Sequence, residues 1–150
     1  MTTALALEAG YWSSLGRGAG AIVLYALLGL ALLLIGFQVV DWTTPGPLRS
    51  MVARGLPNAV VISSAAMISV ALIVVLAIFA QGGRLAEGLI ATTVYGLVGI
   101  VAQVIAVRAL EFTLGIDIGV VLRNPEFSIE SVVVSAGHIA IGLVVAVAIL

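Results

Sequence analysis

Four uncharged, apolar stretches constrain the fold of this chain more than any other feature of its sequence. They run over residues 19–40, 58–80, 89–107 and 131–150. Each has about 20 residues, the length that an α-helix needs to cross the hydrocarbon core of a bilayer. Because lipid offers the backbone no hydrogen-bonding partners, such a segment must satisfy its own peptide groups as a helix. The sequence therefore predicts an all-α membrane protein with four transmembrane helices.

Composition excludes several classes of function. Charged residues make up 9% of the chain and hydrophobic residues 63%, against about 25% charged residues in soluble domains. The net charge of −1 leaves no basic surface for nucleic acid. With no Cys and one His, thiolate and multi-histidine metal sites are excluded. No glycine-rich phosphate loop, G-x-S-x-G or H-E-x-x-H motif is present, so we expect neither an enzyme nor a cofactor.

A triplet of acid, aromatic residue and threonine occurs twice in the chain. Asp41-Trp42-Thr43 ends the first apolar stretch, and Glu111-Phe112-Thr113 ends the third. At the same shift of 70 positions, Tyr25-x-Leu27-x-Gly29 returns as Tyr95-x-Leu97-x-Gly99. The shared spacing predicts a tandem duplication of a helix–loop–helix hairpin.

The duplication predicts the topology. Residues 19–80 and 86–150 form the two hairpins, and residues 1–18 form an N-terminal segment at the membrane interface or a frayed terminus. Each hairpin crosses the membrane twice, so both hairpins enter from the same side. They are therefore expected to be parallel, related by rotation about the membrane normal and not inverted.

Both triplets are then expected at one membrane face, in the loops that join the helices of each hairpin. We call this end of the molecule the triplet end. Aromatic side chains suit headgroup depth, so the triplets serve as interface anchors or as part of a binding surface. Four of the six arginines lie near this end, which favours cytoplasmic triplet loops and external termini. The candidate residues in these loop elements are Asp41, Trp42, Thr43, Arg49, Arg54, Arg108, Glu111, Phe112 and Thr113.

Small and polar side chains follow one face of each predicted helix at 100° of rotation per residue. In the second hairpin we call the polar ones the polar seam: Thr92, Gln103, Ser131, Ser135 and His138. The corresponding stripes of the first hairpin are expected at Ala26, Gly29 and Gly36 and at Ser64, Met67 and Ala71. Rows of small residues let helices approach closely in lipid, so packing and a solute path are both open roles.

Polar substitutions distinguish the second hairpin from the first. Three members of the polar seam, Thr92, Gln103 and His138, replace apolar residues at the corresponding positions of the first hairpin: Ile22, Leu33 and Met67. Polar side chains in the membrane need partners. An intramembrane function is therefore expected in the second hairpin.

Gln103 and His138 are expected to pair with each other. At 1.5 Å per residue they lie about 10 Å and about 15 Å from the triplet end, on antiparallel helices. A neutral imidazole and a glutamine amide each offer both a donor and an acceptor. Ser135 is a candidate third member of the pair. The histidine is either a satisfied structural group or a protonatable element.

The chain also resembles a known family. The residues that carry the resemblance are Asp41, Thr44-Pro45, Gly55 and Asn58-Ala59, within two tandem two-helix units that cover the chain from about residue 20 to its end. These features are similar to the bacterial inner-membrane family of domain of unknown function 350, the YjfL-like proteins. In the second unit Leu114-Gly115 replaces Thr-Pro, and Asn124-Pro125 replaces the Gly…Asn-Ala turn.

The resemblance implies a multi-pass protein of the bacterial cytoplasmic membrane without an established activity. It also implies partners, since genes of such proteins often neighbour those for polyamine-synthase-like, peptide-ligase-like and membrane-stress proteins.

Two functions of different classes remain open. One is a small homo-oligomeric scaffold whose triplet end binds soluble or membrane proteins. The other is a subunit of an ion or small-solute channel or transporter that acts through the polar seam. The sequence favours the scaffold, because ion transport normally requires charged side chains at mid-membrane depth, and none is placed there.

Overall fold

The computed structural model describes residues 10–80 and 84–150. Its long helices are α1 (Tyr11–Thr43), α3 (Pro57–Phe79), α4 (Leu85–Leu114) and α6 (Ile129–Ala148). Two short helices, α2 (Leu48–Ala53) and α5 (Ile118–Arg123), lie between the long helices of each half. The described residues contain no strand. All four long helices are long and apolar enough to cross a membrane, which confirms the predicted all-α membrane fold.

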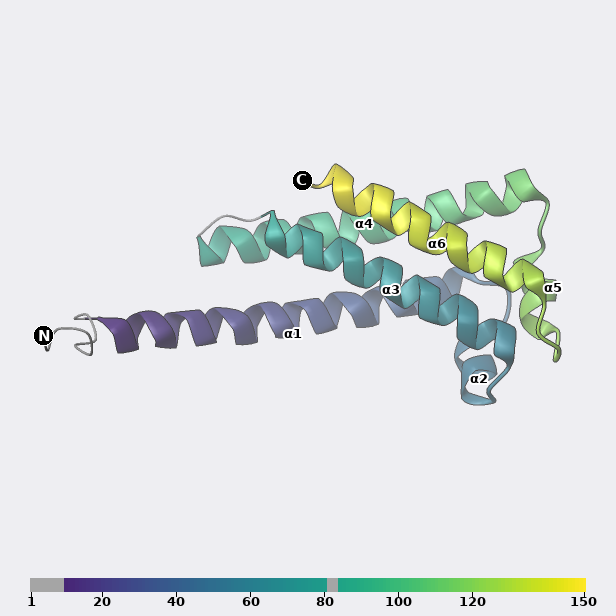
Figure 1. The fold of residues 1–150 in the computed structure, drawn as a ribbon, viewed down its shortest axis with the longest axis horizontal. Helices are drawn as coiled ribbons and strands as arrows, with labels where there is room; N and C mark the ends of the chain where they lie inside the picture. Colours follow the sequence, from purple (N-terminus) through teal and green to yellow (C-terminus); the bar gives the residue numbers. More distant parts are fainter. Residues whose placement is uncertain (1–9, 81–83) are drawn as a thin grey trace, which may run out of the picture.

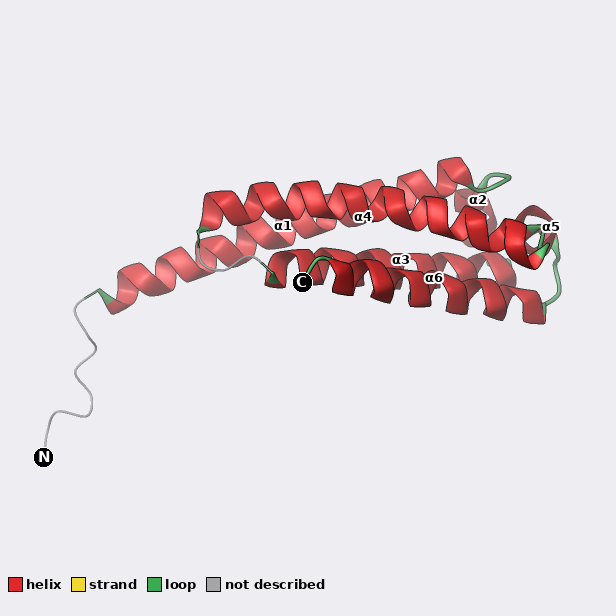
Figure 2. Ribbon diagram, turned by 90° about the horizontal axis from the view of Figure 1, so that it is seen from above, coloured by secondary structure: helices red, strands yellow, loops and turns green. Residues whose placement is uncertain are grey.

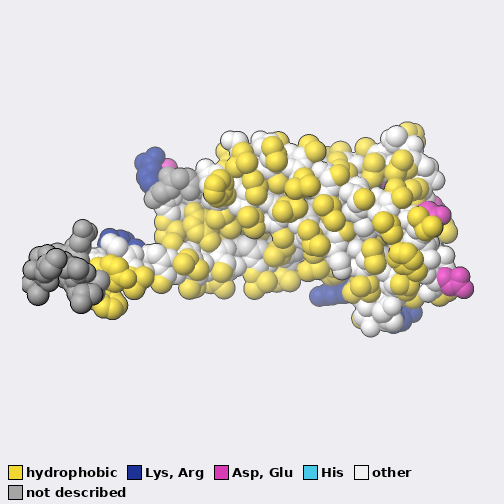
Figure 3. All heavy atoms as spheres, in the orientation of Figure 1, with side chains coloured by type: hydrophobic (Ala, Val, Ile, Leu, Met, Phe, Trp, Pro, Cys, Tyr) yellow, Lys and Arg dark blue, Asp and Glu magenta, His cyan; other side chains and the backbone are white. Residues whose placement is uncertain are grey.

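The helices form a bundle with two distinct ends (Figures 1 and 2). The short helices α2 and α5 lie at one end, and the C-terminus lies toward the other. Helices α1 and α4 run toward the end that carries α2 and α5, and α3 and α6 run away from it. On the face shown in Figure 3, hydrophobic side chains cover the length of the bundle and charged side chains lie toward its ends. The relation of the two halves by rotation about the membrane normal stays a prediction.

Two of the long helices extend beyond the predicted apolar stretches. Helix α1 begins at Tyr11 and so includes part of the predicted N-terminal segment, of which residues 1–9 lie outside the described residues. Helix α4 continues to Leu114 and ends at Gly115, whose φ of 65° is the left-handed conformation typical of a residue that follows a helix.

Both triplets are therefore helical, whereas the sequence analysis placed them in loops. Asp41, Trp42 and Thr43 form the last turn of α1, and Glu111, Phe112 and Thr113 lie near the end of α4. Arg49 and Arg108 are likewise inside helices, and Arg54 directly follows α2. The apolar pattern ends before the helix does, because polar residues at a membrane surface can continue a helix into water.

The short helices were not predicted, and they occupy matching positions. Helix α5 begins and ends 70 positions after α2. Each helix buries one face in the same apolar cluster, with Leu48 and Met51 from α2 and Ile118, Val121 and Leu122 from α5. Six residues are too few for periodicity to separate a helix from a loop. Their apolar faces fix both helices against the end of the bundle.

Helix α3 is the centre of the bundle and packs against every other helix. Its contact with α6 is close, because a Cβ at Gly142 would collide with Ser69. The predicted stripe of α3 is wrong: Ser64 is exposed and Met67 is 46% exposed. Its buried polar side chains are Asn58, Ser63 and Ser69. Three long helices, α1, α4 and α6, pack against α3, so it buries more than the single face that a stripe describes.

Helix α1 is the most peripheral of the long helices. In its predicted stripe Gly36 is buried, Gly29 is half-buried and Ala26 is exposed. Nothing from the rest of the described chain lies within 4 Å of a Cβ placed at Gly16 or Gly20. The N-terminal part of α1 therefore extends beyond the packed bundle (Figure 1).

Candidate functional site at the triplet end

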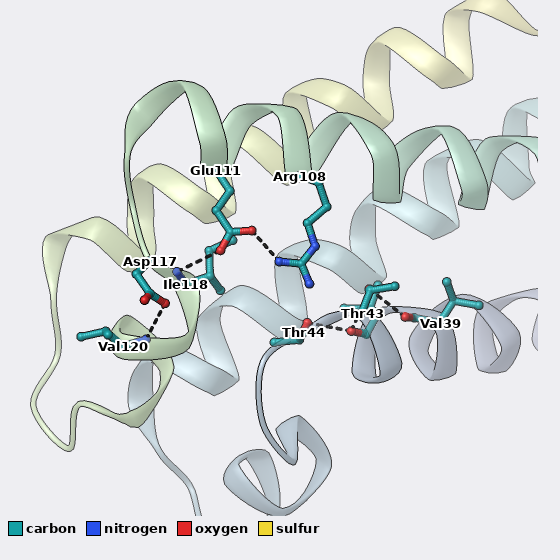
Figure 4. A network of polar contacts seen from close by, with 9 residues as sticks. Val39, Thr43, Thr44, Arg108, Glu111, Asp117, Ile118 and Val120 are labelled. Carbon is teal, nitrogen blue, oxygen red and sulfur yellow. Dashed lines mark hydrogen bonds and ion pairs between the residues drawn. The ribbon is translucent and has the colours of Figure 1, made fainter.

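The acids of the two triplets bind the short helices. An Asp41 carboxylate oxygen accepts a hydrogen bond from the backbone N–H of Arg49, at 3.0 Å. A Glu111 carboxylate oxygen accepts one from the backbone N–H of Ile118, at 3.3 Å (Figure 4). Both N–H groups lie in the first turn of a helix, where intrahelical acceptors are missing. The acid at the end of each long helix thus satisfies the beginning of the next short one.

The threonines of the triplets bind the carbonyl groups of their own helices. Thr43 Oγ1 donates to the carbonyl of Val39 at 2.8 Å, and Thr113 Oγ1 donates to that of Ala109 at 2.7 Å. Side chains of this kind often bond the carbonyl four residues earlier. The aromatic members point away from the bundle, since Trp42 is 76% and Phe112 is 91% exposed. Their position suits the predicted headgroup anchoring, which stays a prediction.

One ion pair and one further cap complete the network of Figure 4. Arg108 Nη1 donates to the second oxygen of Glu111 at 2.6 Å. Asp117, which precedes α5, accepts from the backbone N–H of Val120 at 3.2 Å. Glu111 and Asp117 therefore both stabilise the start of α5. In the described residues no three His, Asp or Glu side chains lie close enough to share a metal ion.

Asn58 joins the two halves of the chain at the same end. Its amide nitrogen donates to the carbonyls of Asn124 and Glu126, at 3.1 and 2.8 Å. Its amide oxygen accepts from the backbone N–H of Ser128, at 2.9 Å. The side chain is fully buried and uses both amide atoms on the segment before α6. In the sequence Asn58 stands at the start of an apolar stretch and among the residues that carry the family resemblance, and nothing local reveals a partner 66 or more residues away.

The same segment does not begin a helix, although an asparagine followed by a proline is a common pattern for an N-cap and a first helical residue. Asn124 instead follows α5, and its side chain accepts from the backbone N–H of Glu126 at 3.0 Å, while α6 begins at Ile129. An asparagine before a proline is found in turns as well as at helix starts. Here the Asn124 backbone forms a turn, and its carbonyl accepts a hydrogen bond from Asn58.

The polar seam is buried, and it contains the expected pair. All five members, Thr92, Gln103, Ser131, Ser135 and His138, are buried. Gln103 Nε2 lies 3.4 Å from His138 Nδ1. Ser135 is not a third member, because its hydroxyl has no hydrogen-bond partner among the described residues.

The remaining hydroxyls of the seam bond to backbone carbonyls. Ser131 donates to Ser128 at 2.7 Å, and Thr92 lies 3.4 Å from the carbonyl of Ala77. These bonds hold helix ends and helix pairs together.

A small cavity links the polar seam to the triplet end. Its volume is about 30 Å³. Its polar lining consists of Thr43, Thr44, Arg108, Gln103 and His138, contributed by α1, α4, α6 and the connection after α1. The structure thus brings the candidate pair Gln103 and His138 together with Thr43 and Arg108, the two candidates from the triplet end that line the cavity.

The remaining candidates lie on the outer surface of the triplet end. Arg49 and Arg54 are exposed on and directly after α2, and Arg123 is exposed at the end of α5. Arg54 bonds the carbonyl and hydroxyl of Ser50. The Arg123 guanidinium lies beside Gly46 of the first hairpin. We call residues 44–56 and 115–128, which include α2 and α5, the platform.

Comparison with known proteins places the chain in a family. The family model described as Domain of Unknown Function (DUF350) matches residues 12–149. The chain belongs to this family. This DUF350 chain is 34% identical over 134 residues to a UPF0719 transmembrane protein of Mycolicibacterium paratuberculosis, covering 89% of each chain. It is 43% identical over 81 residues to a UPF0719 transmembrane protein of Mycobacterium bovis, covering 53% of each chain. No solved structure matches it.

Proposed function

We propose that this protein is a small, homo-oligomeric scaffold of the bacterial cytoplasmic membrane, and that its platform binds a partner protein. The single observation that carries the proposal is the pair of acid caps, Asp41 on α2 and Glu111 on α5. Together with the Asn58 bridge they hold two short helices in fixed positions outside the apolar core. A preorganised surface loses little conformational entropy when it binds, which favours affinity.

The charges of the platform support a protein partner. Its two short helices present Arg49, Arg54 and Arg123, while Asp117 and Glu126 are exposed on the connections around α5. Arginine is enriched at protein interfaces, and arrangements of charge mainly select the partner and speed its approach. The described chain has far fewer exposed charges along the bundle, so this end is the part that could recognise a folded protein.

Close packing in the membrane interior favours a scaffold over a channel or transporter. Beyond the Gln103–His138 pair, a Cβ at Gly99 would collide with Ile73, and one at Gly142 would collide with Ser69. These contacts fill the seam with side chains. The buried, hydrogen-bonding pair itself favours the second candidate, a channel or transporter subunit for ions or small solutes.

Charge reversal tests the scaffold. The full chain carries Arg49→Glu and Arg54→Glu, and proteins captured with it from its native membrane are compared with those captured by the unchanged chain. We expect the specific partner to be lost. The matched control carries Arg17→Glu and Arg84→Glu, which lie away from the platform. This control should retain the partner. Equal capture by all three chains would contradict the proposal.

Reconstitution separates the two candidates. Purified protein in sealed vesicles is tested for flux of protons, small cations and polyamines. Robust flux that is lost in a folded Gln103→Leu variant would contradict the scaffold and support the channel or transporter.

A further inference from the structure

The cavity beneath Arg108 has a function of its own, independent of whether the platform binds a protein. We propose that it is a water-filled pocket: a binding site for one or two ordered water molecules that opens at the triplet end and stops at the Gln103–His138 pair. It would give solvent access to the middle of the bundle from one side of the membrane only.

An unpartnered atom points to the ligand. Gln103 is 1% exposed, and its Oε1 has no hydrogen-bond partner among the described residues. Only its Nε2 is used, on His138. If the nitrogen and oxygen positions of the Gln103 amide were exchanged, one atom would still face His138 and the other would still lack a hydrogen-bond partner. A buried amide oxygen without a donor is costly, and bound water is the usual way to satisfy it.

The size and lining of the cavity fit water. A volume of about 30 Å³ exceeds the roughly 10–15 Å³ that a cavity needs to hold one water molecule, and a bound water needs two to four polar partners. The cavity offers Gln103 and His138 at its inner end and Thr43, Thr44 and Arg108 at its outer end. The guanidinium can donate, and the threonine oxygens can accept, since each hydroxyl spends its proton on a carbonyl.

The exposure of the lining gives the direction of entry. Arg108 and Pro45 line the cavity and are exposed at the triplet end, whereas Gln103 and His138 are buried. One turn further from the triplet end, Ile73 fills the space against Gly99, and Ser69 fills the space against Gly142. The pocket is therefore closed toward the opposite membrane face.

Silver-ion accessibility of single cysteines tests the pocket. The chain has no Cys, so each variant carries one thiol. Val104→Cys places it in the cavity lining, and Val101→Cys places it on the same helix at a position exposed on the apolar surface. Sealed vesicles are treated with silver ions, denatured and labelled with a maleimide, and the loss of labelling gives the rate of silver binding. Labelling of Arg54→Cys by a membrane-impermeant maleimide identifies the triplet side.

Silver ions bind the thiolate form of cysteine. A thiol that contacts water can ionise, whereas burial in apolar surroundings suppresses its ionisation. Silver added at the triplet side should react with Val104→Cys at least about tenfold faster than with Val101→Cys. Adding Gln103→Leu to Val104→Cys should slow the reaction several-fold. Equal rates at positions 104 and 101, equal access from both membrane sides, or an unchanged rate with Gln103→Leu would each overturn the proposal.

Discussion

Asp41 and Glu111, 70 positions apart, make the same contact: each accepts a hydrogen bond from the first turn of the short helix that follows its own long helix. The repeated triplet therefore has a local physical role. Its acid caps the next helix, and its threonine hydroxyl bonds a carbonyl of its own helix. The aromatic member is exposed and points away from the bundle. Each triplet couples the end of a transmembrane helix to one half of the platform.

Removing each cap should loosen only its own short helix. We expect Asp41→Ala to speed amide hydrogen exchange in α2 by about fivefold and Glu111→Ala to do the same in α5, because a lost cap costs about 1 kcal/mol. Asp41→Asn keeps an acceptor and should change exchange less. Each variant serves as the control for the other. Equal acceleration of both helices by one substitution would contradict the separate roles of the two acids.

Asn58→Ala should destabilise the whole fold more than loss of a surface hydroxyl. It removes three hydrogen bonds between the halves and leaves two carbonyls and one N–H without their side-chain partner. The expected loss in free energy of unfolding is about 2–4 kcal/mol, measured by denaturant titration in detergent. The control is Ser50→Ala, which removes a hydroxyl that bonds Pro47 within the platform. Similar losses for both variants would show that Asn58 does not join the halves.

Sequence reasoning reached the membrane fold and the pair in the interior, and it failed where partners are distant. Four apolar stretches are enough to predict four helices in lipid, and antiparallel depth placed Gln103 beside His138. The short helices were missed because six residues carry little periodicity. The bridge that Asn58 makes between the two halves was missed because its three partners lie at residues 124, 126 and 128. The inward face of α3 was misplaced because a helix packed against three long neighbours has no single buried stripe.

Close packing between α3 and α6 predicts a sharp difference between two glycines. Gly142→Ala should lower the free energy of unfolding by about 1–3 kcal/mol, because the added Cβ collides with Ser69, including its backbone. Gly16→Ala is the matched control. Among residues 10–80 and 84–150 nothing lies within 4 Å of its added Cβ, and alanine is the better helix former, so stability should not fall. Thermal unfolding in one detergent compares them. A harmless Gly142→Ala would contradict the tight α3–α6 contact.

A double-mutant cycle measures the pair in the membrane interior. The variants are Gln103→Leu, His138→Leu and the two combined, and the coupling energy is expected near about 0.6 kcal/mol, the usual size for hydrogen bonds between membrane helices. His138→Gln should preserve folding, because an amide can replace the ring nitrogen as a hydrogen-bonding partner of Gln103. Additive effects of the two leucine substitutions would show that the 3.4 Å contact contributes nothing specific.

Site-specific photo-cross-linking in the native membrane tests the central claim most directly. A photoreactive amino acid replaces Ala53, which is exposed at the end of α2 in the platform, or Val101, which is exposed on the apolar surface of α4. The scaffold predicts a discrete adduct with a different protein from position 53, and no such adduct from position 101. The adduct should be lost when Asp41→Ala and Glu111→Ala release both short helices. The same adducts at both positions, or an adduct at position 53 that survives loss of both caps, would contradict a preorganised docking platform.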